Sequence, residues 1–380
     1  MKILHTSDLH LGRQFNGISL EDDHAAVLDQ IARTVADREV NVLIIAGDIF
    51  DRASPPASAV RQFNGFLDRV ANETEAAVVM IAGNHDSGDR IGAMAIMTDR
   101  RRALIRGAVS SVEKPIVISD AHGPVAFSGL PFTYEYAARE CFEDEALQSP
   151  EDVLTAQVAA ARRNVPEGAR WVIVAHSFVT GALASESERP ITRVGGIETV
   201  SSKIFHGAAY VALGHLHRPQ SLGGPHIRYS GSPLAFGFDE EGTTKSMSFV
   251  EIDAEGHVSV EEILFEPLRH VRVLTGSHAE LLLAAPSNDF IKAILTDDVP
   301  VIDGMKRLRE VFPNACDLVY ARDDRGTDTK PLDGQFAKAA DPMEVVGDFL
   351  ELVREERISE KEKEVIAQAL ERLRKEEDSA

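Results

Sequence analysis

Five polar motifs in this sequence carry side chains that commonly bind metal ions. In chain order they are Asp8-Leu9-His10, Gly47-Asp48, Gly83-Asn84-His85-Asp86, a single His176 and Gly214-His215-Leu216-His217. Imidazole and carboxylate groups without thiolates suit borderline divalent ions such as manganese, iron or zinc. Seven candidate ligands are too many for one tetrahedral ion but suit two ions that share a carboxylate, namely Asp8, His10, Asp48, Asn84, His176, His215 and His217. Two such ions hold phosphoryl oxygens and activate water during in-line displacement, so the motifs predict phosphoester hydrolysis.

Each motif taken alone also has an ordinary structural explanation. Asp8 can cap a turn, and Gly83-Asn84 has the composition of a turn with positive φ. A lone His176 is more often a hydrogen-bonded core histidine. The pair His215 and His217 is more specific, because alternate positions place both imidazoles on one side of an extended segment. The prediction of a metal site depends on all five motifs occurring together.

Every motif directly follows a predicted strand. Short, apolar runs rich in β-branched residues precede the motifs, at 3–4, 42–46, 78–81, 172–175 and 211–213. Apolar residues at helical spacing occupy 20–35 and 60–70, between the first three strands. This alternation predicts a layered α/β domain. Because sites in open α/β sheets form at the carboxyl ends of strands, we expect the motifs to converge on one rim.

The rest of the chain predicts two smaller parts beyond a boundary near Pro267. Alternating runs at 125–127, 249–252 and 263–265 suggest hairpins added to the main sheet. Runs at 271–274, 279–283, 299–302, 305–311 and 318–320 predict a small α/β module. From 341 onward, apolar residues at helical spacing on either side of Ser359, a candidate N-cap, predict a helix-loop-helix. The expected domains are therefore 1–266, 267–340 and 341–380.

The formal net charge of −21 argues against tight DNA binding by this chain alone, because Lys and Arg usually make the phosphate contacts. Bound metal ions would neutralise part of that charge, and a basic partner could offset more. Part of it is expected in surface runs at 143–145 and 239–241. The densest basic run, Arg100 to Arg102 with Arg106, is either a solvated surface or a contact for DNA phosphate.

The composition also bears on cellular location. The two cysteines, Cys141 and Cys316, are too few and too far apart for a disulfide framework, which fits a reducing compartment. The first residues have no signal-peptide pattern, and no apolar run is long enough to span a bilayer. We therefore expect a cytoplasmic protein without a membrane segment.

The ordered set of five motifs resembles the calcineurin-like metallophosphoesterase superfamily. Within it, the segments that look like the SbcD-type nuclease family are 6–12, 47–51, 214–220 and 229–233. The resemblance covers most of the first 265 residues. It implies a layered β-sandwich core flanked by helices, with a small α/β capping domain and a C-terminal helix-loop-helix.

The resemblance also implies roles for individual residues. One ion would be held by Asp8, His10, Asp48 and His217, and the other by Asp48, Asn84, His176 and His215. His85 would not be a ligand but would stabilise the transition state or protonate the leaving oxygen. Either Asp51 or Asp86 would orient His85, and the sequence does not distinguish them.

The activity that the resemblance implies is manganese-dependent DNA hydrolysis in repair, recombination and replication. It would include exonuclease action on double strands and endonuclease action on single strands and hairpins. The expected partner is an SbcC-type coiled-coil ATPase, which residues 341–380 would bind. Two copies of this chain would form a homodimer within the resulting heterotetramer. Those helices could instead pack on the chain's own body. Two other functions remain open, a small-substrate phosphomonoesterase or cyclic-nucleotide phosphodiesterase, and a non-catalytic assembly subunit.

Overall fold

The computed structural model describes residues 1–95, 102–188, 192–193, 196–197 and 199–321, together with 359, 362, 363 and 367. The chain divides into two compact units, Met1–Val319 and Tyr320–Ala380. Almost all of the predicted helix-loop-helix at 341–380 lies outside the described residues, as do Arg100 and Arg101. Among the helices that are described, none is both long and apolar enough to cross a membrane.

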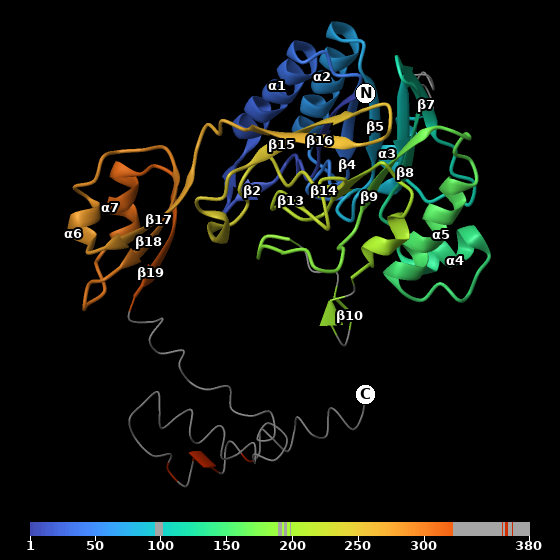
Figure 1. Cartoon of the computed structure of the whole chain (residues 1–380). Coiled ribbons are helices and arrows are strands. Elements are labelled where there is room, and N and C mark those ends of the chain that lie inside the picture. The colour runs from blue at the N-terminus through green and yellow to red at the C-terminus, as the bar shows by residue number, and fades with distance from the viewer. Residues whose placement is uncertain are drawn as a thin grey trace. The chain divides into compact units, whose positions relative to one another are not determined.

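The first sheet of the larger unit has six strands in the order β16-β15-β1-β4-β5-β6 (Figure 1). Four of them are parallel neighbours: β1 (Lys2–Thr6), β4 (Val42–Ala46), β5 (Ala77–Ile81) and β6 (Ala103–Arg106). The hairpin of β15 (Ser246–Ile252) and β16 (Val258–Leu264) extends the sheet antiparallel to β1. Three helices connect the parallel strands: α1 (Glu21–Asp37), α2 (Ala57–Glu73) and α3 (Gly88–Ala93).

The second sheet also has six strands, in the order β13-β14-β12-β9-β8-β7. Its strands are β7 (Ile116–Asp120), β8 (Gly123–Leu130), β9 (Arg170–His176), β12 (Tyr210–Gly214), β13 (Gln220–Ser221) and β14 (Ile227–Tyr229). The accompanying helices are α4 (Glu135–Phe142), α5 (Pro150–Arg162), η1 (Ser202–Phe205) and η2 (Phe238–Glu240). Two short hairpins complete the unit: β2 (Gln14–Phe15) with β3 (Ile18–Ser19), and β10 (Thr192–Arg193) with β11 (Gly196–Ile197).

Alternation along the strands explains the layering of the fold. In β4, Val42 and Ile44 belong to the core between the two sheets, whereas Leu43 and Ile45 belong to the core beneath the helices. Successive strand residues point to opposite faces, so a strand that is apolar throughout is buried on both sides. The inter-sheet core contains residues of both sheets, and helices α1 and α2 cover the outer face of the first. The predicted layered β-sandwich flanked by helices is confirmed.

The module after Pro267 is a small three-stranded sheet that belongs to the larger unit. It contains β17 (Val271–Gly276), α6 (His278–Leu281), β18 (Phe290–Leu295), α7 (Gly304–Val311) and β19 (Ala315–Tyr320). The sequence did not predict β18. The run at 299–302, which was included in the expected module, forms no helix or strand, and Ile302 is 85% exposed. An apolar run on a surface turn resembles a buried element when only its residue types are known.

Candidate metal centre

The predicted strand ends converge where the carboxyl ends of the two sheets meet. Three motifs follow β1, β4 and β5 of the first sheet, and two lie at the ends of β9 and β12 of the second. Main-chain hydrogen bonds tie the first two loops together, from Asp8 N to Gly47 O and from His10 N to Asp48 O, both at 3.0 Å. The candidate carboxylate and imidazole ligands are almost fully buried: Asp8, His10, Asp48, His176, His215 and His217.

Four of these residues have positive φ angles, which are unusual for residues with a side chain. The values are 52° for Asp8, 46° for His10, 48° for Asp48 and 104° for His215. Such conformations cost free energy and cluster at functional sites, where the surrounding structure maintains them. The backbone therefore turns sharply at the ends of β1, β4 and β12 and directs polar side chains into the site.

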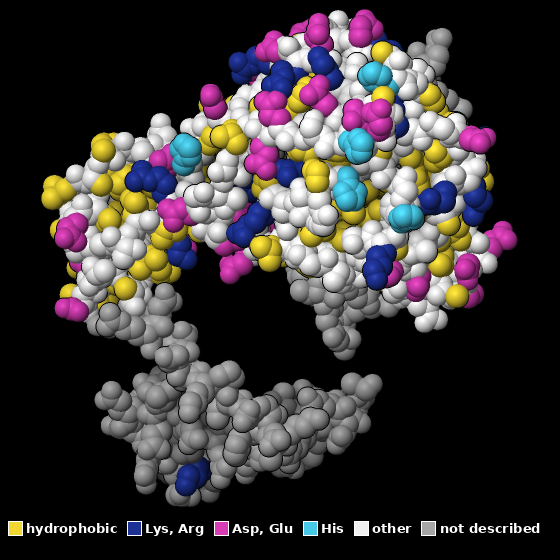
Figure 2. Space-filling view, in the orientation of Figure 1, with side chains coloured by type: hydrophobic (Ala, Val, Ile, Leu, Met, Phe, Trp, Pro, Cys, Tyr) yellow, Lys and Arg dark blue, Asp and Glu magenta, His cyan; other side chains and the backbone are white. Residues whose placement is uncertain are grey.

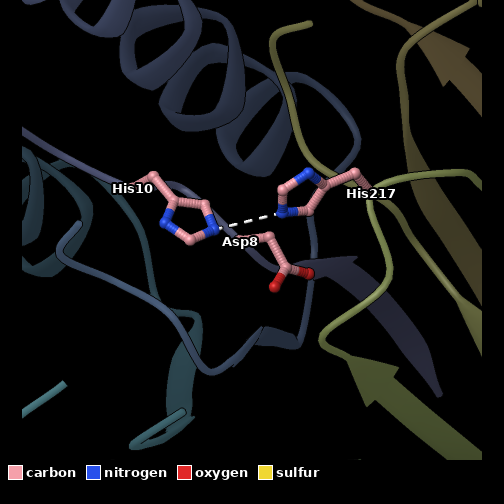
Figure 3. Close-up of side chains that lie close together, drawn as sticks. All are labelled: Asp8, His10 and His217. Atoms are coloured by element: carbon pink, nitrogen blue, oxygen red, sulfur yellow. Dashed lines mark hydrogen bonds between the residues drawn. The ribbon is translucent and has the colours of Figure 1, made fainter. Parts of the chain in front are cut away.

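The first group of converging side chains consists of Asp8, His10 and His217 (Figure 3). The Nε2 atoms of His10 and His217 face each other at 3.2 Å. Two nitrogens that each lie about 2.1 Å from a shared ion are separated by roughly 3.0–3.4 Å, so this spacing fits a common ion. The Asp8 carboxylate accepts hydrogen bonds from the main-chain N–H of His215 at 3.0 and 3.2 Å, which fixes its orientation.

The second group consists of Asn84, His176 and His215. Oδ1 of Asn84 lies 2.9 Å from His176 Nε2 and 3.1 Å from His215 Nδ1. Asp48 lies between the two groups, with Oδ2 placed 3.7 Å from His10 Nε2 and 3.5 Å from His176 Nε2. A carboxylate in that position has the geometry to bridge two ions.

Carbonyl groups fix the ring orientation of two histidines. His176 Nδ1 donates to the carbonyl of Ala46 at 2.9 Å, which leaves Nε2 directed into the site. His85 Nδ1 donates to the main-chain carbonyl of Asp51 at 2.8 Å, and its Nε2 lies 4.0 Å from Asp48 Oδ2. Because a carbonyl can only accept, both Nδ1 atoms carry hydrogen. For His176, this is the usual arrangement of a histidine that binds metal through the other nitrogen.

The pKa values show that the buried site attracts positive charge. Burial alone would lower the pKa of His176, but the charges of Asp48 and Asp8 outweigh it and raise the pKa to about 9. Burial lowers the pKa of His215 to about 3, with repulsion from His176 adding to the effect. A proton on His176 thus balances the carboxylates, and a metal ion would take its place. Together with the converging nitrogen and oxygen donors, this shows that the residues fit divalent ions.

The two acidic residues expected near His85 have different positions. Asp51 orients His85 through its main-chain carbonyl, while its carboxylate lies 3.7 Å from His10 Nδ1. The carboxylate of Asp86 contacts main-chain N–H groups, accepting from Ile49 at 3.1 Å, Phe50 at 2.9 Å and Gly83 at 3.0 Å. Asp86 therefore holds the loops after β4 and β5 together.

Close packing at Gly83 explains why this motif needs glycine. A Cβ atom there would lie 2.2 Å from Asp48 Oδ1. The same oxygen accepts a hydrogen bond from the main-chain N–H of His85 at 2.8 Å. The loop after β5 thus positions Asp48 directly, and any side chain at Gly83 would displace the carboxylate.

The sequence did not reveal a buried network behind His217. Its Nδ1 donates to Ser187 Oγ at 2.7 Å, and Ser187 donates in turn to Glu240. Glu240 forms an ion pair with Lys245, whose Nζ also donates to the carbonyl of His217 at 2.9 Å. Glu188 accepts from the main-chain N–H of His217 at 2.7 Å.

The position of Glu240 corrects one expectation. The run at 239–241 was expected to be a solvated surface, yet Glu240 is only 2% exposed. Burial alone would raise the pKa of Glu240, but its hydrogen bonding with His217 and the charge of Lys245 lower it to about 2, so it stays ionised. A run of three acidic residues carries no signal that its middle member points inward.

Two family models match different parts of the chain. Residues 1–219 match a family model described as calcineurin-like phosphoesterase, and residues 265–354 match one described as type 5 capsule protein repressor C-terminal domain. The chain belongs to the calcineurin-like phosphoesterase family. Within it, the chain is 32% identical over 322 residues to the SbcD component of the nuclease SbcCD from Staphylococcus saprophyticus, covering 84% of each protein.

The solved structures that match this chain include two of low similarity. TT1561 of Thermus thermophilus has a TM-score of 0.36 and 14% identity, over 69% of this chain and 98% of that one. GAP50, described as the anchor in the inner membrane complex of Plasmodium, has a TM-score of 0.37 and 9% identity, over 84% and 96%. Neither likeness is close enough to bear on function.

Proposed function

We propose that this chain is the DNA nuclease subunit of an SbcCD-type complex and hydrolyses phosphodiester bonds at the site described above. The ligands would be Asp8, His10, Asp48 and His217 for one ion, and Asp48, Asn84, His176 and His215 for the other. Mn²⁺ is the proposed metal because the family resemblance implies it, and nitrogen and oxygen donors without thiolates are compatible with it. The nuclease assignment is supported by the identity with the staphylococcal protein over most of both chains.

The observation that carries the chemistry is the position of Asp48. Its Oδ2 lies within 3.7 Å of His10 Nε2 and 3.5 Å of His176 Nε2, which belong to the two ligand groups. When bound, a pair of divalent ions supplies Lewis acidity that activates water and offsets charge on the phosphoryl oxygens. No nucleophilic side chain is then required.

His85 is the proposed proton donor to the leaving oxygen. The bond from its Nδ1 to the carbonyl of Asp51 holds the ring so that Nε2 faces the site. The side chain lines an open cleft of about 740 Å³ with Arg13, Gln14, Asp51 and Arg52. A proton lost from Nε2 can be regained from solvent through this cleft. The guanidinium groups of Arg13 and Arg52 would contact phosphates, and the carboxylates of Asp51 and Glu188 line the same cleft.

The domain division at 1–266, 267–340 and 341–380 is proposed to serve this activity. The first would hold the metals, the second would help to position DNA, and the third would bind the SbcC-type ATPase. The family model that matches 265–354 supports a distinct C-terminal part. Two such chains would form the homodimer of a heterotetramer.

Hydrolysis of a hairpin oligonucleotide, compared with that of a small phosphodiester, tests the proposed function. With Mn²⁺ present, the chain is expected to cleave a labelled DNA hairpin and to lose that activity on chelation. Turnover of the small phosphodiester alone would contradict the nuclease assignment and favour a small-substrate phosphodiesterase.

A further inference from the structure

Three aromatic side chains lead away from the metal centre in a row. The Phe132 ring lies 6.5 Å from the His176 ring, centroid to centroid. The Tyr134 ring lies 5.0 Å from Phe132 and nearly perpendicular to it. Tyr136 follows at 5.8 Å from Tyr134, with only 12° between the ring planes. The row starts at a candidate ligand and ends at the surface.

Hydrogen bonds fix the beginning of this row relative to the site. The main-chain N–H of Phe132 donates to the carbonyl of Ala82 at 3.0 Å. Ala82 immediately precedes the motif that contains Asn84 and His85. The side chain of Gln157, buried on α5, donates to the carbonyl of Pro131 at 3.3 Å. The rings therefore occupy a defined position beside the metal ligands.

The two tyrosines are strongly exposed for large aromatic residues. Tyr134 is 52% exposed and Tyr136 is 66% exposed. Helix α4, which begins at Glu135 and lies beside α5 in Figure 1, is anchored instead through Ala138, which packs with Leu147 and Val153. Single exposed hydrophobic residues are ordinary, whereas two nearly parallel exposed rings near the candidate metal centre form a patch that can bind a ligand.

The charge of the protein favours a ligand that binds through its bases. The net charge is −21, and basic and acidic side chains are interspersed on the described part of the face in Figure 2. Phosphate contacts alone would therefore hold a nucleic-acid strand weakly. Stacking of bases on aromatic rings needs no positive charge and tolerates any sequence.

We propose that Phe132, Tyr134 and Tyr136 form a stacking platform for unpaired bases of a strand whose phosphate lies at the metal centre. This inference rests on the proposed nuclease function and narrows its substrate to strands with accessible bases. Bases in an intact duplex are already stacked on their neighbours. The platform thus selects single strands, hairpin loops and frayed ends.

Binding of oligothymidine, measured by fluorescence anisotropy in a His85→Gln background that slows cleavage, tests the platform. Replacing both tyrosines by alanine is expected to weaken binding about tenfold or more. Replacing both by phenylalanine, which keeps the rings, should preserve binding. The matched control is Leu268→Ala, which removes an apolar side chain that is 60% exposed elsewhere on the surface.

An abasic strand of equal length separates stacking from charge. The abasic strand has the same phosphates as oligothymidine but no bases. Its binding to the protein with intact tyrosines should therefore be weak. That affinity should equal the affinity of the double alanine variant for oligothymidine. The salt dependence of binding should be equal for both proteins. Equal binding of abasic strand and oligothymidine by the protein with intact tyrosines would overturn the platform.

A second outcome would also overturn the proposal. If the double alanine variant binds strands normally but no longer retains the partner ATPase, the rings belong to a protein interface. The nuclease function is tested separately, by hairpin cleavage with the unaltered chain. If the unaltered chain cleaves the hairpin but the protein binds oligothymidine and the abasic strand equally, the stacking platform is wrong and the nuclease assignment is still supported.

Discussion

At the residue scale, His217 depends on a hydrogen-bond chain that ends in a buried ion pair. Ser187 links its Nδ1 to Glu240, and Lys245 balances the charge of Glu240. Residues that orient metal-binding histidines in this way contribute to metal affinity without contacting the ion. The network also fixes the tautomer of His217, so that Nε2 is available to the site.

Ser187→Ala is expected to weaken Mn²⁺ binding about 10-fold or more, because His217 loses its hydrogen-bond acceptor. The ion pair between Glu240 and Lys245 remains, so the fold should be retained. Isothermal titration with Mn²⁺ measures the effect, and Ser119→Ala on the exposed edge of β7 is the control. Unchanged affinity in the Ser187 variant would show that the network does not position the ligand.

Acidification is expected to weaken metal binding through His176. Its pKa of about 9 without metal means that below this pH an ion must displace a proton. Burial also raises the pKa of Asp8 to about 8, so a second proton must be displaced below that pH. Affinity should therefore rise with pH by about tenfold per unit for each displaced proton and level off near pH 9. Mn²⁺ titrations at several pH values between 6 and 9 measure this slope, and a flat profile would be inconsistent with a protonated His176.

At the element scale, loops from adjacent strands carry the candidate ligands, and hydrogen bonds connect these loops to one another. The carboxylate of Asp86, at the end of the loop after β5, accepts hydrogen bonds from main-chain N–H groups of that loop and of the loop after β4. Asp48 and His85 keep their spacing through the same contacts, because the N–H of His85 bonds to Asp48. The fold therefore controls the distance between Asp48, the proposed bridging carboxylate, and His85, the proposed proton donor.

Asp86→Ala leaves three buried N–H groups without their acceptor. We expect a loss of roughly 3 kcal/mol in the free energy of unfolding, together with weaker metal binding. Thermal unfolding of the metal-free protein measures the first effect. Asp89→Ala, at an exposed position in the first turn of α3, is the control and should unfold at nearly the original temperature. A matching temperature for both variants would refute this role for Asp86.

The strands and the candidate ligands were predictable because two sequence signals coincide. Short β-branched runs mark buried strands, and the polar motifs begin where those runs end. The orienting group of His85 was not predictable, because a main-chain carbonyl such as that of Asp51 leaves no mark in the residue types. The burial of Glu240 could not be predicted from the sequence for a different reason. Its inward position depends on Lys245 and Ser187, which come from separate loops.

At the scale of the whole molecule, the proposed function requires an acidic chain to act on an acidic polymer. Bound ions and the arginines of the cleft would supply positive charge, while the exposed rings offer contacts that do not depend on charge. The proposed partner ATPase would supply further DNA contacts. Catalysis and retention of DNA would then be divided between two proteins.

Deletion of 341–380 is expected to abolish co-purification with the SbcC-type ATPase. The candidate metal ligands all precede this segment, so metal-dependent cleavage of simple substrates should persist. Pull-down of the two co-expressed proteins measures the association, and hydrolysis of a small phosphodiester measures the site. Undiminished co-purification would place the partner interface elsewhere on the chain.

The most direct test is to measure bound manganese and hairpin cleavage together in three proteins. The unaltered chain should bind two ions per chain and cleave. His85→Gln should bind two ions but cleave at least about a hundredfold more slowly, since a general acid contributes that much. Asp48→Asn should lose at least one ion and all cleavage. Hairpin cleavage by His85→Gln at the original rate, or a single ion in the unaltered chain, would contradict the two-metal site with His85 as its proton donor.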